Sequence, residues 1–325
     1  MAQWLIDKII EMDGNTPNHH FAMLGTINWM KALRIYCEKE QFQYQNIKEF
    51  YKNERPSNSV KIEQEVYSFQ NLAFAVHNLH ALKELKNVDC KFSVVRSAII
   101  AWYYCIYNGT KAMLVASSGN DAETHAKVAN MFHADLVDKN KILEPFSWNI
   151  ENLIATEIKS TIENLRQGNT YNTNDCPQTE IEAKGVLLSY LNGTAKRASE
   201  LAQENIKKDK KFKELKVDNF RTKKAREIRD QQLIKMKVNF LNQSFRFRGK
   251  ANYRDAIYLT LNNNYMNEAV ISQFIEDMTI VANSYTKMAY EFTRKSVRKT
   301  SWNEFIKDFD ENNIIGFNNA AFLNQ

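Results

Sequence analysis

"WYYCIYNGTKAML", residues 102–114, lies within a regular apolar pattern. The apolar residues recur at spacings of three, four and seven, which place them on one face of a helix: Val95, Ile99, Trp102, Ile106 and Met113. Gly109 stands where this series would have one further apolar residue. A neighbouring backbone can approach a glycine closely, at a helix propensity cost of about 1 kcal/mol. The pattern therefore predicts a core helix over residues 92–116.

Similar patterns predict helices on both sides of this segment. Thr124 is placed to cap a short helix that begins at His125. An isoleucine stripe predicts a helix over residues 148–166, and small residues suited to close packing predict another over residues 179–206. Residues 60–86 contain no helix breaker, and their apolar residues form a wide face: Val66, Phe69, Phe74, Val76, Leu79 and Leu82.

The composition also favours long helices with few connections. Among 325 residues only 9 are Gly and 4 are Pro, which is few for a fold with many tight turns. We therefore expect an all-α protein, an antiparallel helical bundle with additional N- and C-terminal helices. The sequence predicts an N-terminal helical segment over residues 1–59, the bundle over residues 60–206, and a basic C-terminal helical domain over residues 207–325.

The four cysteines are far apart in the sequence, and none forms a CxxC pair. This usage indicates reduced thiols in a cytoplasmic protein rather than a disulfide framework or a zinc site. The N-terminus does not resemble a signal peptide, and no apolar run is long enough to cross a membrane. Gly-rich phosphate loops, GxSxG and HExxH are absent, which disfavours an ATPase, a hydrolase or a metalloenzyme. We expect no cofactor, no metal and no membrane partner.

Four features of residues 60–206 occur together in the sequence. The pair Tyr103 and Tyr104 precedes an aromatic residue, a polar residue and the run GTKAML, and ETHAKVANMF opens the next helix with Thr-His. IENLRQGNTYN places Leu-Arg and a later Tyr at the end of the fourth helix, and the last helix is rich in Ala. This order resembles the HEPN family, RNA-associated helical bundles of toxin–antitoxin, CRISPR and phage-defence systems. The resemblance implies pairing with a protein partner or as a homodimer through the long helices.

HEPN ribonucleases carry an Arg followed, after four to six residues, by a His on the same helix. Such a pair can move the ribose hydroxyl proton and stabilise the phosphorane. Alignment on the Tyr-Tyr pair puts Ala101 and Asn108 in these two positions, and neither side chain can do this chemistry. Arg96 lies about 18 Å along the helix axis from Asn108, too far to replace the missing Arg. The resemblance therefore implies a non-catalytic or strongly diverged member.

The six histidines give no clear metal site. His77 and His80 have a spacing that can hold zinc, but no Cys or acidic residue is positioned to complete the site, which favours a structural role. His125 fits the Thr-His opening of the family and a plain capping position equally well. His19, His20 and His133 have no local constellation and stay unassigned.

Basic charge is concentrated between Lys207 and Arg254, where 17 residues are Lys or Arg and 5 are Asp or Glu. The resulting net charge of +12 exceeds the +6 of the whole chain. Such asymmetry suits a phosphate-binding surface, although a lysine-rich helix can also be a solvated face. The pattern predicts one basic helix over residues 210–241.

The basic segment supplies the candidate nucleic-acid-binding residues. Guanidinium groups bind phosphate, and aromatic rings stack on unpaired bases, so a mixture of the two suits RNA or single-stranded DNA. Phe245, Phe247 and Tyr253 interleave with basic residues here; alternatively these rings are core and the arginines extend from it to the solvent. The candidates are Arg246, Arg248, Lys250, Arg254, Lys223, Lys224 and Arg226.

Three hypotheses follow for function. The favoured one is a non-catalytic or diverged HEPN-like protein that binds nucleic acid and a partner in a bacterial antiphage defence or toxin–antitoxin system. The second is a metal-independent endoribonuclease with an unconventional site, such as Arg254 with Tyr258, in a second diverged bundle within residues 207–325. The third is a structural protein–protein interaction subunit whose basic residues face the solvent.

Overall fold

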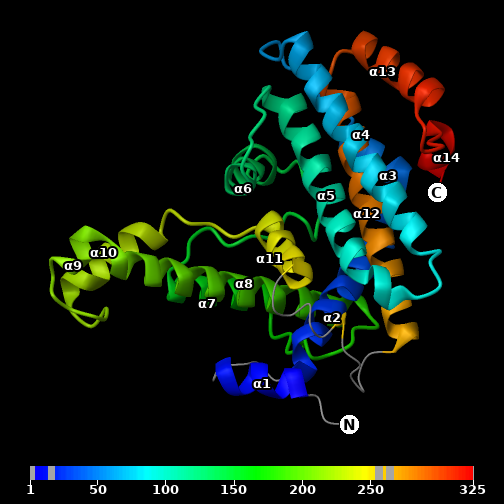
Figure 1. The fold of residues 1–325 in the computed structure, drawn as a ribbon. Helices are drawn as coiled ribbons and strands as arrows, with labels where there is room; N and C mark the ends of the chain where they lie inside the picture. Colours follow the sequence, from blue (N-terminus) through cyan, green and yellow to red (C-terminus); the bar gives the residue numbers. More distant parts are fainter. Residues whose placement is uncertain (1–3, 14–18, 253–258, 261–266, 325) are drawn as a thin grey trace.

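The computed structural model describes residues 4–13, 19–252, 259–260 and 267–324. Within these ranges the regular secondary structure is helical, which confirms the predicted all-α class (Figure 1). The one extended pairing described is an isolated antiparallel bridge between Ile150 and Val238. In the same ranges, no helix combines the length and the apolar character needed to cross a membrane.

Helix α5 (Lys91–Ser118) contains the opening sequence and forms the centre of the protein. It packs along α4 (Ile62–Leu85) and α12 (Glu268–Ser296), and the three helices stand side by side in Figure 1. Helix α11 (Phe240–Asn252) covers a further side of α5. Trp102 and most other apolar residues of α5 are fully buried, as expected for a helix with apolar residues around most of its circumference.

Gly109 lies in the contact between α5 and α12. A Cβ atom built on Gly109 would lie 3.4 Å from Cβ of Ala289 and 3.5 Å from the ring of Tyr285. The next residue, Thr110, shares a buried hydrogen bond with Tyr285, with 2.6 Å between their hydroxyl oxygens. The element that packs on Gly109 is therefore α12, and its nearest atoms belong to side chains rather than to the backbone that the sequence pattern predicted.

A second layer is formed by α8 (Glu180–Lys208), α7 (Ala155–Arg166) and α2 (His19–Cys37). Figure 1 shows α7 and α8 running across the column of α4, α5 and α12. Trp29 of α2 joins the layers, because it stacks on Tyr190 of α8 at 4.4 Å and meets Trp102 of α5 edge-on at 5.9 Å.

The prediction of one continuous basic helix over residues 210–241 is wrong, because the segment is interrupted. The segment forms α9 (Lys210–Lys213), a connection, α10 (Lys223–Leu233) and an extended stretch before α11. Asp209 and Thr222 cap α9 and α10, and Lys216 adopts a left-handed backbone conformation with φ of 52°. These capping residues give the backbone an alternative to a continuous helix.

The start of the predicted 148–166 helix is also wrong, because α7 begins only at Ala155. Ile150 instead exchanges backbone hydrogen bonds with Val238, at 2.7 and 3.0 Å. An apolar stripe cannot distinguish a buried extended segment from a helix end. This pairing ties residues before α7 to residues before α11.

The remaining helices lie around these layers. They are α1 (Trp4–Asp13), α3 (Tyr44–Phe50), α6 (His125–Met131), α13 (Lys299–Asn312) and α14 (Asn319–Asn324), with a 3-10 turn at Glu40–Phe42 and a π-helix at Phe132–Val137. In Figure 1, α13 and α14 lie beside the upper part of α4 and α12.

The main apolar core contains Trp29, Trp102 and Phe274, one residue from each of the three predicted domains. The core therefore crosses both predicted boundaries, at residues 59/60 and 206/207. Helix α8 packs chiefly on α2 and α7. A HEPN-like arrangement of residues 60–206 remains a prediction.

Gly109→Leu should lower the free energy of unfolding by about 1–3 kcal/mol, because the larger side chain overpacks the contact with Tyr285 and Ala289. Gly109→Ala should be at least as stable as the wild type, since its Cβ lies at ordinary contact distance. Urea denaturation measures both. Ala126→Leu, on the exposed face of α6, is the control and should change stability little. Equal stability of Gly109→Leu and the wild type would contradict the close packing of α5 on α12.

Candidate nucleic-acid interface

The structure places the predicted nucleic-acid-binding residues in two separate sets. Arg246 and Arg248 lie on α11, whereas Lys223, Lys224 and Arg226 are exposed on α10. Arg254 and the side chain of Lys250 lie outside the described residues.

Both sets contact helix α8, so the distance between them can be measured along this helix. Arg246 donates a hydrogen bond to Thr194 of α8, and α10 packs on Ile206 of the same helix through Ala225. Thr194 and Ile206 are twelve residues apart, or about 18 Å along the helix axis. Figure 1 shows α9 and α10 at one end of α8 and α11 nearer the central helices.

Arg248 lies among three aromatic rings at the α11 end. The carbon of its guanidinium group is 5.4 Å from the ring centre of Tyr103, 5.5 Å from that of Tyr104 and 5.8 Å from that of Phe245. Each distance is within the range of a cation–π contact. Its Nε is buried without a hydrogen-bond partner among the described residues. The rings therefore hold the guanidinium group in place mainly by stacking.

His125 completes this cluster from the start of α6. Its Nδ1 is hydrogen-bonded to the hydroxyl of Tyr103 at 2.7 Å. The imidazole ring also packs on Tyr107 at 4.7 Å and on Phe245 at 5.2 Å. Burial, and then the positive charge of Arg248, hold the pKa of His125 below its ordinary value. Thr124 caps α6 by accepting from the amide of Lys127, so the predicted cap is confirmed.

The aromatic residues of this surface differ in exposure. Phe247 is fully buried in the core, whereas Phe245 keeps 46% of its surface exposed. Tyr104 and His125 are partly exposed, and Tyr103 is buried. We call the set Tyr103, Tyr104, Tyr107, His125, Phe245 and Arg248 the Arg248 cluster. The sequence left two interpretations open for these rings. Phe247 is a core ring, whereas Phe245 is exposed enough to contact a ligand.

Arg246 occupies a different environment from Arg248. Its Nη1 donates to Oγ1 of Thr194 at 3.0 Å, and its guanidinium group lies 5.2 Å from the ring centre of Tyr190. These contacts join α11 to α8. Arg246 is only partly exposed, so a structural role accounts for much of its environment.

The two residues aligned with the HEPN catalytic pair, Ala101 and Asn108, supply no reactive side chain to this cluster. Ala101 is buried, and Asn108 carries only an amide. Arg96 donates to the backbone carbonyl of Ala251 at 2.9 Å, which is a structural contact between α5 and α11. No Arg in the sequence is followed by His after four to six residues. The fold nevertheless brings Arg248 close to His125, although more than a hundred residues separate them.

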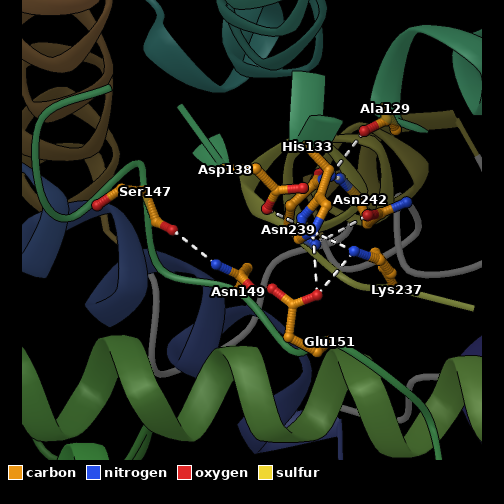
Figure 2. Close-up of polar contacts among 9 residues, drawn as sticks. All are labelled: Ala129, His133, Asp138, Ser147, Asn149, Glu151, Lys237, Asn239 and Asn242. Atoms are coloured by element: carbon orange, nitrogen blue, oxygen red, sulfur yellow. Dashed lines mark hydrogen bonds and ion pairs between the residues drawn. The ribbon is translucent and has the colours of Figure 1, made fainter. Parts of the chain in front are cut away.

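A second polar cluster, around His133, was missed by the sequence analysis. Nε2 of the buried His133 lies 3.0 Å from Asp138 and 3.2 Å from Glu151. Lys237 contributes Nζ, 2.6 Å from Nε2 of His133 and 2.7 Å from Oε2 of Glu151 (Figure 2). Glu151 and Lys237 are brought together because they flank the paired residues Ile150 and Val238.

The donor set of the His133 cluster is one that a divalent cation could use. The ligand atoms of His133, Asp138 and Glu151 lie within 4.8 Å of one another. Lys237, however, already supplies a positive charge between His133 and Glu151, as Figure 2 shows. Burial raises the pKa of Glu151, but the hydrogen bond and positive charge of Lys237, together with the contact to His133, outweigh it and hold this pKa below its ordinary value. The ammonium group of Lys237 thus supplies the positive charge that a metal ion would supply at this position.

The other histidines of the described helices have separate surroundings. His77 is exposed on α4, and His80 meets the ring of Phe317 edge-on at 6.4 Å. Neither belongs to the one metal-type cluster found among the described residues. The side chains of His19 and His20 are not described.

No family model, no curated protein and no solved structure matches this chain. The relation to HEPN proteins therefore rests on the sequence resemblance and remains a prediction.

Lys237→Ala should turn the His133 cluster into a zinc site. Removal of the ammonium group leaves one imidazole and two carboxylates without a cation, and these are typical Zn²⁺ ligands. We expect Zn²⁺ to raise the melting temperature of the variant by binding its folded state, and EDTA to reverse the effect. The wild type and the control Lys235→Ala, on the same segment, should respond little. Equal responses of all three proteins to Zn²⁺ would show that Lys237 does not fill this site.

Proposed function

We propose that this chain binds single-stranded nucleic acid, RNA in particular, through the Arg248 cluster. The observation that carries the proposal is the stacking of Arg248 among Tyr103, Tyr104 and Phe245 while nearly half of Phe245 stays exposed. A fixed guanidinium group offers donors to phosphate, and an exposed ring beside it can stack on an unpaired base.

The position of the cluster also supports RNA as the ligand. The Tyr-Tyr pair and the Thr-His opening, which carry the resemblance to HEPN proteins, both contribute side chains to it: Tyr103, Tyr104 and His125. That resemblance alone is the basis for proposing that the protein acts in a bacterial antiphage defence or toxin–antitoxin system.

The exposed cations of α10 would extend the interface. Lys223, Lys224 and Arg226 take part in no ion pair within the described ranges, so they add long-range attraction for phosphate. On α8, the contact of Arg246 at Thr194 and the contact of α10 at Ile206 are about 18 Å apart along the axis, a separation that one strand a few nucleotides long can span. The contribution of the α10 cations should depend strongly on salt, since exposed charges are screened.

Phe245→Ala should weaken binding of a single-stranded RNA oligonucleotide about tenfold, because loss of one base–aromatic stack costs about 1–3 kcal/mol. This loss should be similar at low and high salt. Arg248→Gln should weaken binding and also reduce the slope of log affinity against log salt by about 0.7, the value for one phosphate contact on a single strand. Fluorescence anisotropy at several salt concentrations measures both effects.

Matched controls separate these effects from general loss of structure. Phe50→Ala removes another exposed ring, 41% exposed on α3, and Arg55→Gln removes another exposed guanidinium group. Both should bind RNA as the wild type does. If Phe245→Ala and Arg248→Gln bind normally while remaining folded, the proposed interface is incorrect.

A second candidate function is metal-independent cleavage of RNA, and the proximity of Arg248 to His125 favours it. When Nδ1–H of His125 donates to the hydroxyl oxygen of Tyr103, Nε2 is unprotonated and available to accept a proton. The lowered pKa keeps the imidazole neutral near pH 7, the form required of a general base. Arg248 would stabilise the negative charge of the phosphorane. This pair replaces the site built on Arg254, which lies outside the described residues.

Incubation of single-stranded RNA with the protein in EDTA tests this second function. Cleavage by attack of the 2′-hydroxyl should leave a 2′,3′-cyclic phosphate, spare DNA, and fall at least about 100-fold in His125→Ala. Activity should be constant at neutral pH and decline in acid as His125 becomes protonated, below its ordinary pKa of about 6.5. His77→Ala, an exposed histidine of α4, is the control. RNA binding without cleavage, or cleavage that persists in His125→Ala, would reject a catalytic role for His125.

A further inference from the structure

A pocket with a volume of about 540 Å³ lies between α3, α12, α13 and α14. Its size is within the range of sites that bind small molecules. None of these four helices contributes to the Arg248 cluster, so the pocket is a separate feature of the protein.

The walls of the pocket include three aromatic side chains. Trp302 meets Tyr290 edge-on, with 4.8 Å between ring centres and 84° between planes, and Tyr44 lines the side formed by α3. The hydroxyl of Tyr290 donates to Oδ1 of Asn319 at 2.6 Å, which fixes the ring against α14. Trp302 and Tyr290 are almost fully buried. The partly exposed Tyr44 therefore provides the aromatic surface against which a flat ring can pack, and the buried Tyr290 and Trp302 form a rigid wall beside it.

A buried carboxylate orients the cationic side chain at the base of the pocket. Glu291, which has no exposed surface, accepts two hydrogen bonds from Arg294, from Nε at 2.7 Å and from Nη2 at 2.6 Å. The hydroxyl of Tyr44 donates to the same carboxylate at 2.9 Å, and burial raises the pKa of Tyr44, which keeps that hydroxyl protonated. Arg294 is held in one orientation, and its Nη1 takes part in neither bond to Glu291.

The charged residues that line the pocket are all positive: Lys48, Arg294 and Lys307. Because Glu291 neutralises Arg294, the excess charge comes from the two lysines. Lys48 lies 3.3 Å from the side-chain oxygen of Gln45 and 5.8 Å from the ring centre of Tyr44, contacts that leave its charge uncompensated. Within the described ranges no carboxylate forms an ion pair with Lys48 or Lys307. Two uncompensated cations at one opening attract an anion.

We propose that this pocket binds a small anion that carries a flat ring, with a nucleoside monophosphate as the simplest example. The ring packs on Tyr44, and the anionic group lies toward Lys48 and Lys307. The proposal does not rest on nucleic-acid binding by the Arg248 cluster, and failure of either leaves the other intact.

Isothermal titration calorimetry of the full chain with AMP, adenosine and inorganic phosphate tests the proposal. AMP should bind. Adenosine and phosphate should each bind at least about tenfold more weakly than AMP, since each lacks one of the two recognised groups. The double variant Lys48→Gln/Lys307→Gln should lose about tenfold in affinity for AMP, since hydrogen bonds to charged groups are lost. Its affinity for adenosine should not change.

The matched control is Lys52→Gln/Lys299→Gln, which removes the same charge from exposed positions after α3 and at the start of α13. It should bind AMP as the wild type does, and thermal melts should show that both double variants are folded. Absence of heat with all three probes would overturn the proposal. Equal affinities for AMP and phosphate, or equal losses in both double variants, would overturn it as well, because ring contact or the named lysines would then contribute nothing.

Discussion

The central part of helix α5 is enclosed by α4, α11 and α12, so buried polar groups on these faces require partners inside the protein. The hydroxyl of Ser68 on α4 donates to the carbonyl of Ala112, and Thr110 pairs with Tyr285 of α12. Cys105 lies 3.1 Å from the hydroxyl of Thr286. At Tyr104, which is partly exposed, α5 reaches the surface beside α6 and α11. The position of the Arg248 cluster follows from this enclosure.

The sequence predicts helices well where an apolar series is long. The helix around Trp102 and the cap at Thr124 are found where the sequence pattern places them, because local periodicity reports burial on one face. Prediction of exposure is poorer: Phe74 belongs to the predicted apolar face of α4, yet 48% of its surface is exposed. A single helix does not reveal which part of a wide apolar face its neighbours will cover.

The functional clusters could be predicted only in part. Arg248 is predicted from its basic and aromatic neighbours, which include Phe245, but the rings of Tyr103 and Tyr104 come from α5 and the imidazole of His125 from α6, and no local spacing connects them. The same is true of His133, whose partner Lys237 becomes adjacent only through the pairing of Ile150 with Val238. Long-range pairing of this kind depends on tertiary packing, which a hydrophobic pattern does not specify. The basic segment likewise appeared continuous in charge, although capping residues divide it into pieces with different surroundings.

Helices α9 and α10 have an apolar cluster of their own, separate from the main core. Its buried members are Ile206, Phe212 and Ala225, with a few partly buried residues beside them. So little buried surface provides a small local stability, whereas α5 shares the stability of the whole protein. Any local opening of this part has to release Leu233, which joins α10 to the cluster under α7 and α8, and a ligand held by the lysines of α10 would then bear the entropy of ordering it.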